Sequence, residues 1–190
     1  MKKLLWGLFS VFLCIAFINP AGATVWELGI GGNGHTYKVV EFADIGWVDA
    51  LGDIYNTLGD GYALATITSQ GEQDFIESLL SGYSGEYWVG GFQAPGQSDP
   101  LSSWNWMTGE EWGYTNWASG EPNDYGGRDE HYLAVWSKYS QDSWKWNDEG
   151  YFNNISGYIA ESLPVPEPGT IVLMGLGLVG LAGVGRKKFK

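Results

Sequence analysis

Residues 114–148 read YTNWASGEPNDYGGRDEHYLAVWSKYSQDSWKWND and contain three groups of oxygen-bearing side chains. The groups are Gly120-Glu121-Pro122-Asn123-Asp124, Asp129-Glu130 and Trp146-Asn147-Asp148. Calcium in proteins takes about 6 to 8 oxygen ligands from carboxylates, amide carbonyls and water. Side chains in these groups supply most of such a shell. The residue types therefore favour a calcium site with ligands at Glu121, Asn123, Glu130, Asn147 and Asp148.

The order of these motifs resembles the carbohydrate-recognition domain of C-type lectins. In that family an aromatic-Thr-Asn-Trp run precedes Glu-Pro-Asn, and Trp-Asn-Asp follows about twenty residues later. Upstream, residues 61–67, 88–91 and 104–110 also fall in the family's order, so the resemblance covers residues 26–161. It implies an α+β, C-type lectin-like fold with two helices, short antiparallel strands and a long loop region.

The resemblance also implies that one ion holds the sugar. Two neighbouring sugar hydroxyls replace water on the calcium ion, and each forms hydrogen bonds to Asn and Glu ligands, which keep donors and lone pairs available. In the family the Glu-Pro-Asn form accompanies mannose, glucose, N-acetylglucosamine or fucose, and its proline follows a cis peptide bond. The same five residues, Glu121, Asn123, Glu130, Asn147 and Asp148, are thus the predicted carbohydrate ligands.

The middle ligand has two candidates, Asp129 and Glu130. Glu130 is preferred because it lies two residues before the predicted strand that begins at Tyr132, as in the family. Asp129 is then solvated or serves a second cation. Asp124 is placed like a ligand of an accessory calcium in the family, but His131 stands where another carboxylate often occurs, which leaves that second site open.

Both ends of the chain have the composition of targeting segments. Lys2 and Lys3 precede an apolar run, and Ala21-Gly22-Ala23 is a small-x-small cleavage site, so residues 1–23 are a predicted signal peptide. Residues 164–190 contain Pro166-Glu167-Pro168, an apolar run and a basic end. They resemble the bacterial PEP-CTERM sorting signal.

That second resemblance implies a processing enzyme of the exosortase type and removal of the tail. The apolar run of 17 residues lies at the short limit for a membrane span, and its basic end favours the cytoplasmic side. The alternative is a permanent anchor in the inner membrane. Both interpretations place the predicted domain, residues 24–163, outside that membrane, at the cell surface or in the extracellular space.

Charge and cysteine content exclude several classes of function. Residues 24–163 contain 21 acidic and 4 basic residues, whereas nucleic-acid binding needs Lys and Arg to neutralise phosphates. The single cysteine, Cys14, lies in the predicted signal peptide, so the mature chain has no thiol chemistry. Tyr132 and Ala160 stand where the resemblance would expect half-cystines.

Periodicity predicts two helices. Apolar residues recur at helical spacing at Ile45, Val48, Leu51, Tyr55 and Leu58, which predicts a helix over residues 46–58. Residues 69–80 begin with Ser69 and Glu72 in the form of a capping box. Short apolar or aromatic runs predict strands at 35–42, 87–92, 104–107, 133–136, 143–146 and 158–161. Four tryptophans are predicted core residues (Trp88, Trp104, Trp106 and Trp146), and three are left open (Trp112, Trp117 and Trp144).

The sequence therefore predicts an exported, non-enzymatic protein that binds a glycan or exopolysaccharide through calcium. A second hypothesis keeps the fold but assigns a protein-binding or biofilm-matrix role. A third is a glycosidase with paired carboxylates drawn from Asp129, Glu130 or Glu110, which lie in no distinctive motif. No Gly-x-Ser-x-Gly elbow, phosphate loop or dinucleotide motif occurs in the chain.

Overall fold

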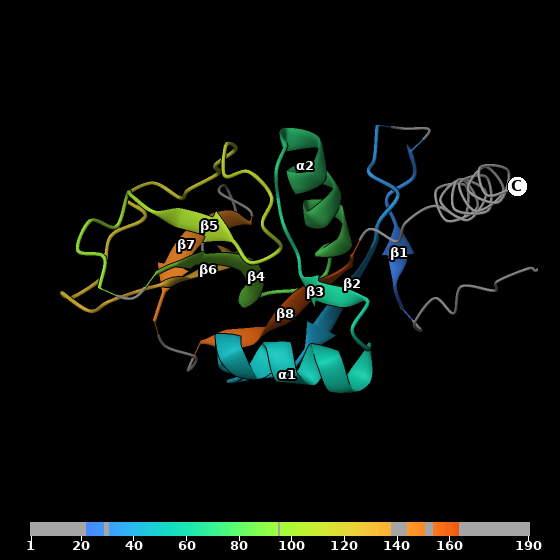
Figure 1. Cartoon of the computed structure of the whole chain (residues 1–190), viewed down its shortest axis with the longest axis horizontal. Coiled ribbons are helices and arrows are strands. Elements are labelled where there is room, and N and C mark those ends of the chain that lie inside the picture. Colours follow the sequence, from blue (N-terminus) through green and yellow to red (C-terminus); the bar gives the residue numbers. More distant parts are fainter. Residues whose placement is uncertain (1–21, 29–30, 95, 138–143, 151–153, 164–190) are drawn as a thin grey trace, which may run out of the picture.

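The computed structural model describes residues 22–28, 31–94, 96–137, 144–150 and 154–163. Almost all of the predicted signal peptide and the whole predicted sorting tail lie outside these residues. The described part is an α+β fold with two helices packed on a mixed sheet (Figure 1). Its elements are β1 (Thr24–Val25), β2 (Thr36–Glu41), α1 (Trp47–Thr57), β3 (Tyr62–Leu64), α2 (Gln70–Leu79), β4 (Glu86–Gln93), β5 (Trp104–Trp106), β6 (Tyr132–Trp136), β7 (Lys145–Glu149) and β8 (Ile155–Ser162).

The sheet joins strands that are far apart in the chain. Its order is β1-β2-β8-β4-β6-β7, with β3 paired to β8 and β5 paired to β4. The pairing of β4 with β8 is parallel, and the other pairings are antiparallel. The predicted fold class is therefore confirmed, and one parallel pair occurs beside the predicted antiparallel strands.

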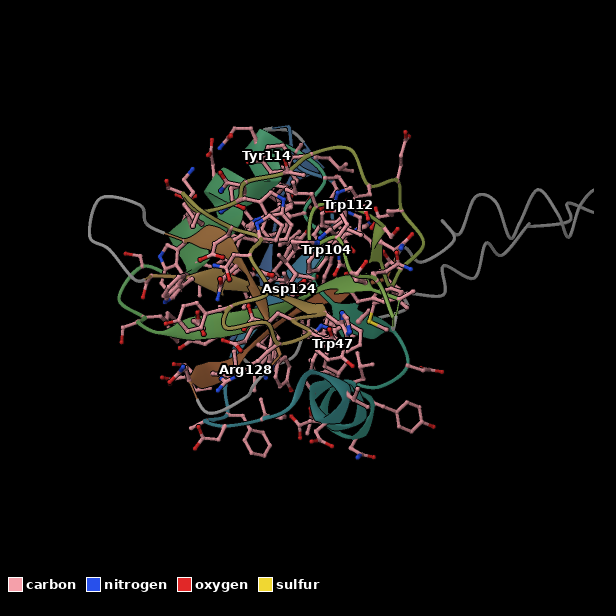
Figure 2. All side chains as sticks on the ribbon, turned by 90° about the vertical axis from the view of Figure 1, so that its left-hand side faces the viewer. Trp47, Trp104, Trp112, Tyr114, Asp124 and Arg128 are labelled. Atoms are coloured by element: carbon pink, nitrogen blue, oxygen red, sulfur yellow. The ribbon has the colours of Figure 1, made fainter. Side chains whose placement is uncertain are left out.

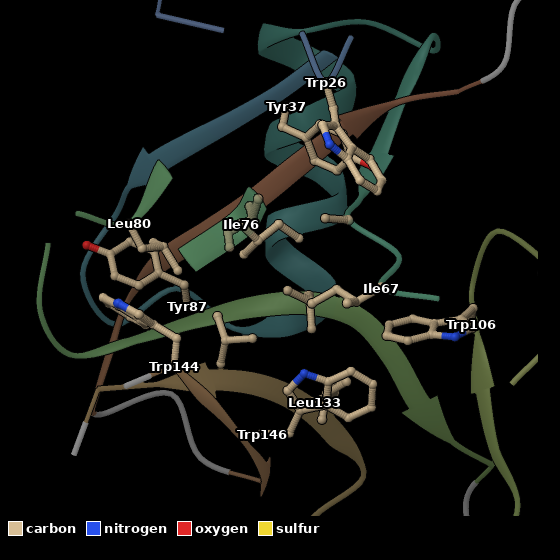
Figure 3. Close-up of a cluster of buried hydrophobic side chains, with 14 of the residues drawn as sticks. Trp26, Tyr37, Ile67, Ile76, Leu80, Tyr87, Trp106, Leu133, Trp144 and Trp146 are labelled. Carbon is tan, nitrogen blue, oxygen red and sulfur yellow. The ribbon is translucent and has the colours of Figure 1, made fainter. Parts of the chain in front are cut away.

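The two helices cover opposite faces of β8. Successive side chains of a strand point to opposite sides, so β8 supplies residues to the core under each helix. Ile159 packs in the core on the α2 side. The same core contains Ile76, Tyr87 and Trp146 (Figure 3). Tyr158 and Ala160 pack in the core on the α1 side. The sheet thus separates two apolar cores, and each helix closes one of them.

Helix α1 was predicted with nearly the right ends, but only part of the predicted apolar stripe faces the core: Ile45 is buried, and Leu51 and Leu58 pack against the core, whereas two other residues do not. Val48 and Tyr55 are 60% and 68% exposed, whereas Trp47, Ala50 and Ile54 are buried. Both faces carry apolar residues at helical spacing, so periodicity alone did not separate them. The indole of Trp47 donates to the carbonyl of Val89, which fixes the buried face on the sheet.

Helix α2 begins as predicted, but only half of the predicted capping box forms. The Ser69 hydroxyl accepts a hydrogen bond from the Glu72 amide at 3.2 Å. The Glu72 carboxylate instead accepts from the amide of Thr68 at 2.8 Å and from the hydroxyl of Tyr37. Glu72 therefore belongs to a wider network that crosses from α2 to the sheet.

We call this the inner acidic network; it contains Asn33, His35, Tyr37, Glu72 and Glu161. The Tyr37 hydroxyl lies 2.5 Å from Glu72 Oε1 and 2.8 Å from Glu161 Oε1. The Thr66 amide donates to Glu161 Oε2 at 2.9 Å. The network ties β2 and α2 to β8, the last strand of the domain.

The strand predictions near the ends of the long loop were incomplete. β7 continues through Glu149, whereas the predicted strand stopped at Trp146; residue 143, where that prediction began, lies outside the described residues. β1 and β3 were not predicted, because strands of two and three residues give too short a pattern. The longer β7 changes where Asn147 and Asp148 point.

The tryptophan predictions hold. Trp88, Trp104, Trp106 and Trp146 are buried, as expected, and Trp144 joins them at 6% exposure. Trp112 and Trp117 are partly buried and pack against Trp104, with ring centroids 5.7 Å and 5.0 Å away. In Figure 2 the rings of Trp104 and Trp112 lie toward α2, and Trp47 lies beside α1. These aromatic contacts hold much of the long loop on the sheet.

Candidate functional site

Four of the five predicted ligands meet at one cavity. Glu121, Asn123, Glu130 and Asn147 line a hollow of about 330 Å³ beside β6 and β7. Glu121 and Asn123 come from the loop before β6, Glu130 lies just before β6, and Asn147 lies within β7. We call this hollow the acidic cavity. Residues separated by up to 26 positions are therefore brought together by the pairing of β6 with β7.

Asp148 occupies a different place from Asn147, because adjacent residues of a strand point to opposite faces. Asn147 pairs with Ala134, and Asp148 pairs with Leu133 in the α2-side core. Asp148 is not among the residues that line the acidic cavity. Its role as a ligand stays a prediction.

The Asp148 carboxylate instead holds the loop that carries Glu121 and Asn123. Its two oxygens each lie 2.9 Å from the Asn123 amide nitrogen, and Oδ2 lies 2.9 Å from the Asp124 amide nitrogen. Side-chain acceptors that bind backbone amides fix loop conformation in the way a cap fixes a helix end. Asp148 thus positions the Glu-Pro-Asn triplet over the edge of β7.

The loop is also closed on itself. The Glu121–Pro122 peptide bond is cis, as the resemblance implied. The Glu130 amide donates to Asp124 Oδ1 at 3.1 Å, and the Tyr125 amide donates to Glu130 Oε2 at 2.8 Å. These two bonds bring the middle of the loop back to the start of β6.

The structure separates Asp129 from Glu130. The Asp129 side chain is 77% exposed, and its Oδ2 lies 3.8 Å from His131 Nε2. Glu130 is 6% exposed and lines the cavity. The position of Glu130 fits the predicted ligand better than that of Asp129, although its binding of a metal stays a prediction.

Burial gives the cavity unusual electrostatics. Desolvation raises the pKa of Glu130 to about 7; the Tyr125 amide opposes the shift, and the charges of Asp148, Glu149 and Glu121 add to it. Desolvation likewise raises the pKa of Asp148, against the amide hydrogen bonds that lower it. A nearby positive charge would favour the ionised carboxylates.

The donor set fits calcium in kind, because carboxylate and amide oxygens are the hard ligands that calcium prefers. Within the described ranges, no group of three or more His, Cys, Asp or Glu side chains is arranged to hold a metal ion. Any calcium shell here therefore depends on the amide oxygens of Asn123 and Asn147 as well as on carboxylates.

Sequence reasoning missed five residues that also line the cavity: Glu86, Tyr125, Trp136, Glu149 and Asn154. Glu149 was within reach of the sequence, because continuing the strand by alternation from Asn147 puts Glu149 on the same face. Glu86 could not be predicted in this way, because its position in the cavity depends on the order of β4, β6 and β7 in the sheet.

A second cavity of about 380 Å³ lies beside α1 and is mostly apolar. Trp47, Phe92 and Tyr132 form its aromatic wall, and the rings of Trp47 and Tyr132 stack at 4.7 Å.

Comparison with known proteins identifies the family and the fold. A family model described as the lectin C-type domain matches residues 59–153, which is half of the chain. The chain belongs to the C-type lectin domain family. A second model, the PEP-CTERM protein-sorting motif, matches residues 164–187. That motif implies an exported protein processed at the cell envelope.

Among curated proteins, ladderlectin of Oncorhynchus mykiss is 33% identical over 109 residues, which cover 55% of this chain and 53% of ladderlectin. E-selectin of Bos taurus is 36% identical over 93 residues, covering 46% and 17%. The chain therefore spans about half or less of the length of these curated relatives.

Solved C-type lectin domains share the fold. The carbohydrate-recognition domain of cow CD23, determined in the presence of a GlcNAc2Man3 oligosaccharide, has a TM-score of 0.59 at 24% identity, covering 77% of this chain and 97% of that chain. A calcium-independent type II antifreeze protein has a TM-score of 0.58 at 22% identity, covering 77% and 95%. The C-type lectin fold is typically non-enzymatic, and its members differ in whether they use calcium.

Neither helix in the described part of the chain is both long and apolar enough to cross a membrane. The two apolar segments predicted from sequence, near residues 4–18 and 169–185, lie outside the described residues.

Proposed function

We propose that this protein is an exported lectin that binds calcium in the acidic cavity and, through it, a glycan or exopolysaccharide. The observation that carries the proposal is that Glu121, Asn123, Glu130 and Asn147 line one cavity although they come from separate segments. Their oxygen ligands match calcium chemistry. Family membership supports carbohydrate binding as the role of the domain.

Calcium bound at this cavity would supply open coordination positions for two neighbouring sugar hydroxyls. The side chains of this chain would fix the orientation of those hydroxyls. Glu121 and Asn123 lie two residues apart in one loop, so they act as paired acceptor and donor for the same hydroxyl pair. Asp148 keeps that loop in place through the amides of Asn123 and Asp124.

The Glu-Pro-Asn triplet favours a mannose, glucose or fucose type of sugar. The Glu121 carboxylate accepts hydrogen bonds and the Asn123 amide can donate them, and their order along the loop selects the orientation of the two sugar hydroxyls. Tyr125 is 72% exposed at the rim of the same cavity and offers an aromatic face to the sugar ring. Sugar preference thus rests on the triplet first and on the rim second.

Isothermal titration calorimetry tests the proposal with calcium, mannose and fucose. We expect calcium to bind, and sugar to bind only when calcium is present. Glu121→Gln and Asn147→Asp should weaken both events, while Glu111→Gln, at an exposed residue outside the cavity, should leave both unchanged. Sugar binding that persists in excess chelator would contradict the proposal.

A second candidate is a calcium-independent role in binding a protein or matrix component at the cell surface. It is favoured by the finding that carboxylates and histidines in the described segments form no three-membered metal group. A glycan array that stays blank with calcium, combined with retention of a surface protein on the immobilised domain, would favour this role over the lectin.

We also propose that residues 24–163 are the mature domain, released by removal of residues 1–23 and of the tail from residue 164. The sorting motif over residues 164–187 supports the second cut. Mass spectrometry of the protein recovered from its native cells should find Thr24 at the start and no peptide from residues 169–190. Recovery of the intact tail would mean a permanent anchor.

A further inference from the structure

Glu86 is a buried residue of the acidic cavity that neither the motifs nor the family match points out. It begins β4, is 3% exposed and lines the cavity together with Asn147. Asn147 Nδ2 donates a hydrogen bond to Glu86 Oε1 at 3.2 Å. This contact links a predicted calcium ligand to β4, a strand that carries no predicted ligand.

The sheet register makes the contact possible. β6 lies between β4 and β7, so the two residues belong to strands roughly 10 Å apart. Asn147 pairs with Ala134, and Glu86 pairs with Trp136, two residues further along β6. The small side chain of Ala134 leaves room for Glu86 to reach diagonally across the middle strand.

We propose that Glu86 is a positioning residue that orients the Asn147 side-chain amide for calcium, an inference that rests on the proposed calcium site. An amide has one oxygen and one NH2 group, and calcium binds only the oxygen. Glu86 Oε1 accepts the hydrogen bond from Asn147 Nδ2, so this contact selects the orientation of the amide with its NH2 group toward β4. The carbonyl oxygen of Asn147 then faces the remainder of the cavity.

A parallel contact in the loop supports this role. Asn123 Nδ2 donates to Glu121 Oε2, so each asparagine of the predicted shell has its NH2 group held by a glutamate. In the loop the glutamate is itself a predicted ligand. In β7 the partner comes from another strand and is buried, which makes the orientation of Asn147 less dependent on the bound ion.

The arrangement leaves the second Nδ2 hydrogen of Asn147 available to a sugar hydroxyl. One amide hydrogen goes to Glu86, and an amide nitrogen carries two. Glu86 therefore fixes both functions of Asn147, the oxygen that meets calcium and the hydrogen that meets the sugar.

The test measures calcium affinity of four proteins: wild type, Glu86→Met, Asn147→Ala and the double variant. Methionine keeps length but removes the acceptor, and loss of such an outer partner weakens metal binding roughly 10- to 100-fold. In the Asn147→Ala background, Glu86→Met should cause no further loss, because the partner it orients is gone. If the fold-loss of calcium affinity in the double variant equalled the product of the losses in the two single variants, Glu86 would act independently of Asn147, and the proposal would be overturned.

Glu86→Gln is the matched control, and it also covers the case in which Glu86→Met fails to fold. Its amide oxygen still accepts from Asn147 Nδ2, so calcium affinity should stay within a few-fold of wild type. A drop as large as that of Glu86→Met would overturn the positioning role and indicate that the charge itself is needed.

A measurement without calcium separates this inference from the proposed function. In chelator, the NMR signals of the Asn147 side-chain amide should exchange with water more slowly than those of the exposed Asn56, and Glu86→Met should abolish the difference. Fast exchange in the wild type would overturn the orientation. A wild type that shows slow exchange but binds no calcium would overturn the proposed calcium site instead.

Discussion

The inner acidic network and the acidic cavity each hold buried glutamates supplied by different elements of the sheet. In the network, protein donors meet the carboxylates from several sides: Glu72 accepts from the Thr68 amide, Glu161 accepts from the Thr66 amide, and the Tyr37 hydroxyl lies within hydrogen-bond distance of both carboxylates. In the cavity, Glu86, Glu121, Glu130 and Glu149 surround a hollow of about 330 Å³. Burial of a carboxylate is therefore common to both regions, and only the carboxylates of the acidic cavity line a hollow.

The largest effect should come from breaking the network at its centre. In Tyr37→Phe the hydroxyl that shares its one hydrogen between Glu72 and Glu161 is lost, and a hydrogen bond to a charged group contributes about 1.5 to 3 kcal/mol. We expect the free energy of unfolding in urea to fall by about 3 kcal/mol. Tyr55→Phe, at a 68% exposed position on α1, is the control and should change little.

The comparison predicts that calcium affinity of Tyr37→Phe stays close to wild type, because the network lies away from the cavity-lining residues. Affinity that falls together with stability would mean that the two regions are one coupled unit.

Calcium should stabilise the cavity and leave the network alone. A ligand that binds only the folded state at 100 times its Kd adds about 2.7 kcal/mol to the free energy of unfolding. We expect a gain of this size on adding calcium to wild type and to Glu111→Gln, measured by urea denaturation. Glu130→Gln should lose most of the gain, because that side chain lines the cavity. An equal gain in Glu130→Gln would place the ion elsewhere.

The start of α2 should contribute less than the network that it supports. Ser69→Ala removes the hydroxyl that accepts from the Glu72 amide, and loss of such a cap costs about 1 kcal/mol. Ser98→Ala, at an exposed loop position, is the control. A loss in Ser69→Ala as large as that in Tyr37→Phe would show that the cap, and not the carboxylate network, holds the helix to the sheet.

The smallest effect should be the pH dependence contributed by His35. Its pKa is raised, first by the hydrogen bond to Glu161, against desolvation, which lowers it. A group with a raised folded-state pKa stabilises the fold below its unfolded value of about 6.5, and the contribution disappears as pH rises through the folded value. His35 is partly exposed, so solvent screening keeps the contribution below about 1 kcal/mol.

Urea denaturation in chelator at pH 5.5 and pH 8 checks this sign. Wild type should lose more stability than His35→Gln over that rise. Glu72 contributes in the same direction, because desolvation raises the pKa of its carboxyl and so penalises the charged form as pH increases. A wild type that became more stable than the variant as pH rises would contradict the assigned charge on His35.

Local patterns were enough to predict much of this fold. The Ser-x-x-Glu pattern predicted both ends of α2 to within one residue. The order of the motifs predicted the family. Four of the five ligands predicted from those motifs line one cavity in the structure. Local patterns did not predict the buried face of α1, because two faces of that helix carry apolar residues at the same spacing. The face of α1 with Val48 and Tyr55 is as regular as the face with Trp47 and Ile54, and only the sheet beneath α1 selects between them.

The cavity was predicted less completely because part of it is made by the sheet. The sequence predicts Asn147 and Asp148 as two ligands of one loop segment, whereas they are neighbours on β7 and point to opposite faces. Glu86 lines the cavity because β4 lies next to β6, which pairs with β7, and no local sequence pattern predicts that strand order. Residues set by long-range register stay hidden until the strand order is known.

The pairing of β1 with β2 and of β2 with β8 brings the first and last strands of the folded unit close together. Thr24 pairs with Tyr37, which pairs with Glu161, so residues 24 and 161 are separated by roughly two strand spacings, about 10 Å. About three extended residues span that distance. The unit is therefore suited to insertion as a cassette into a surface loop of a host protein, or to closure into a circle with new ends elsewhere.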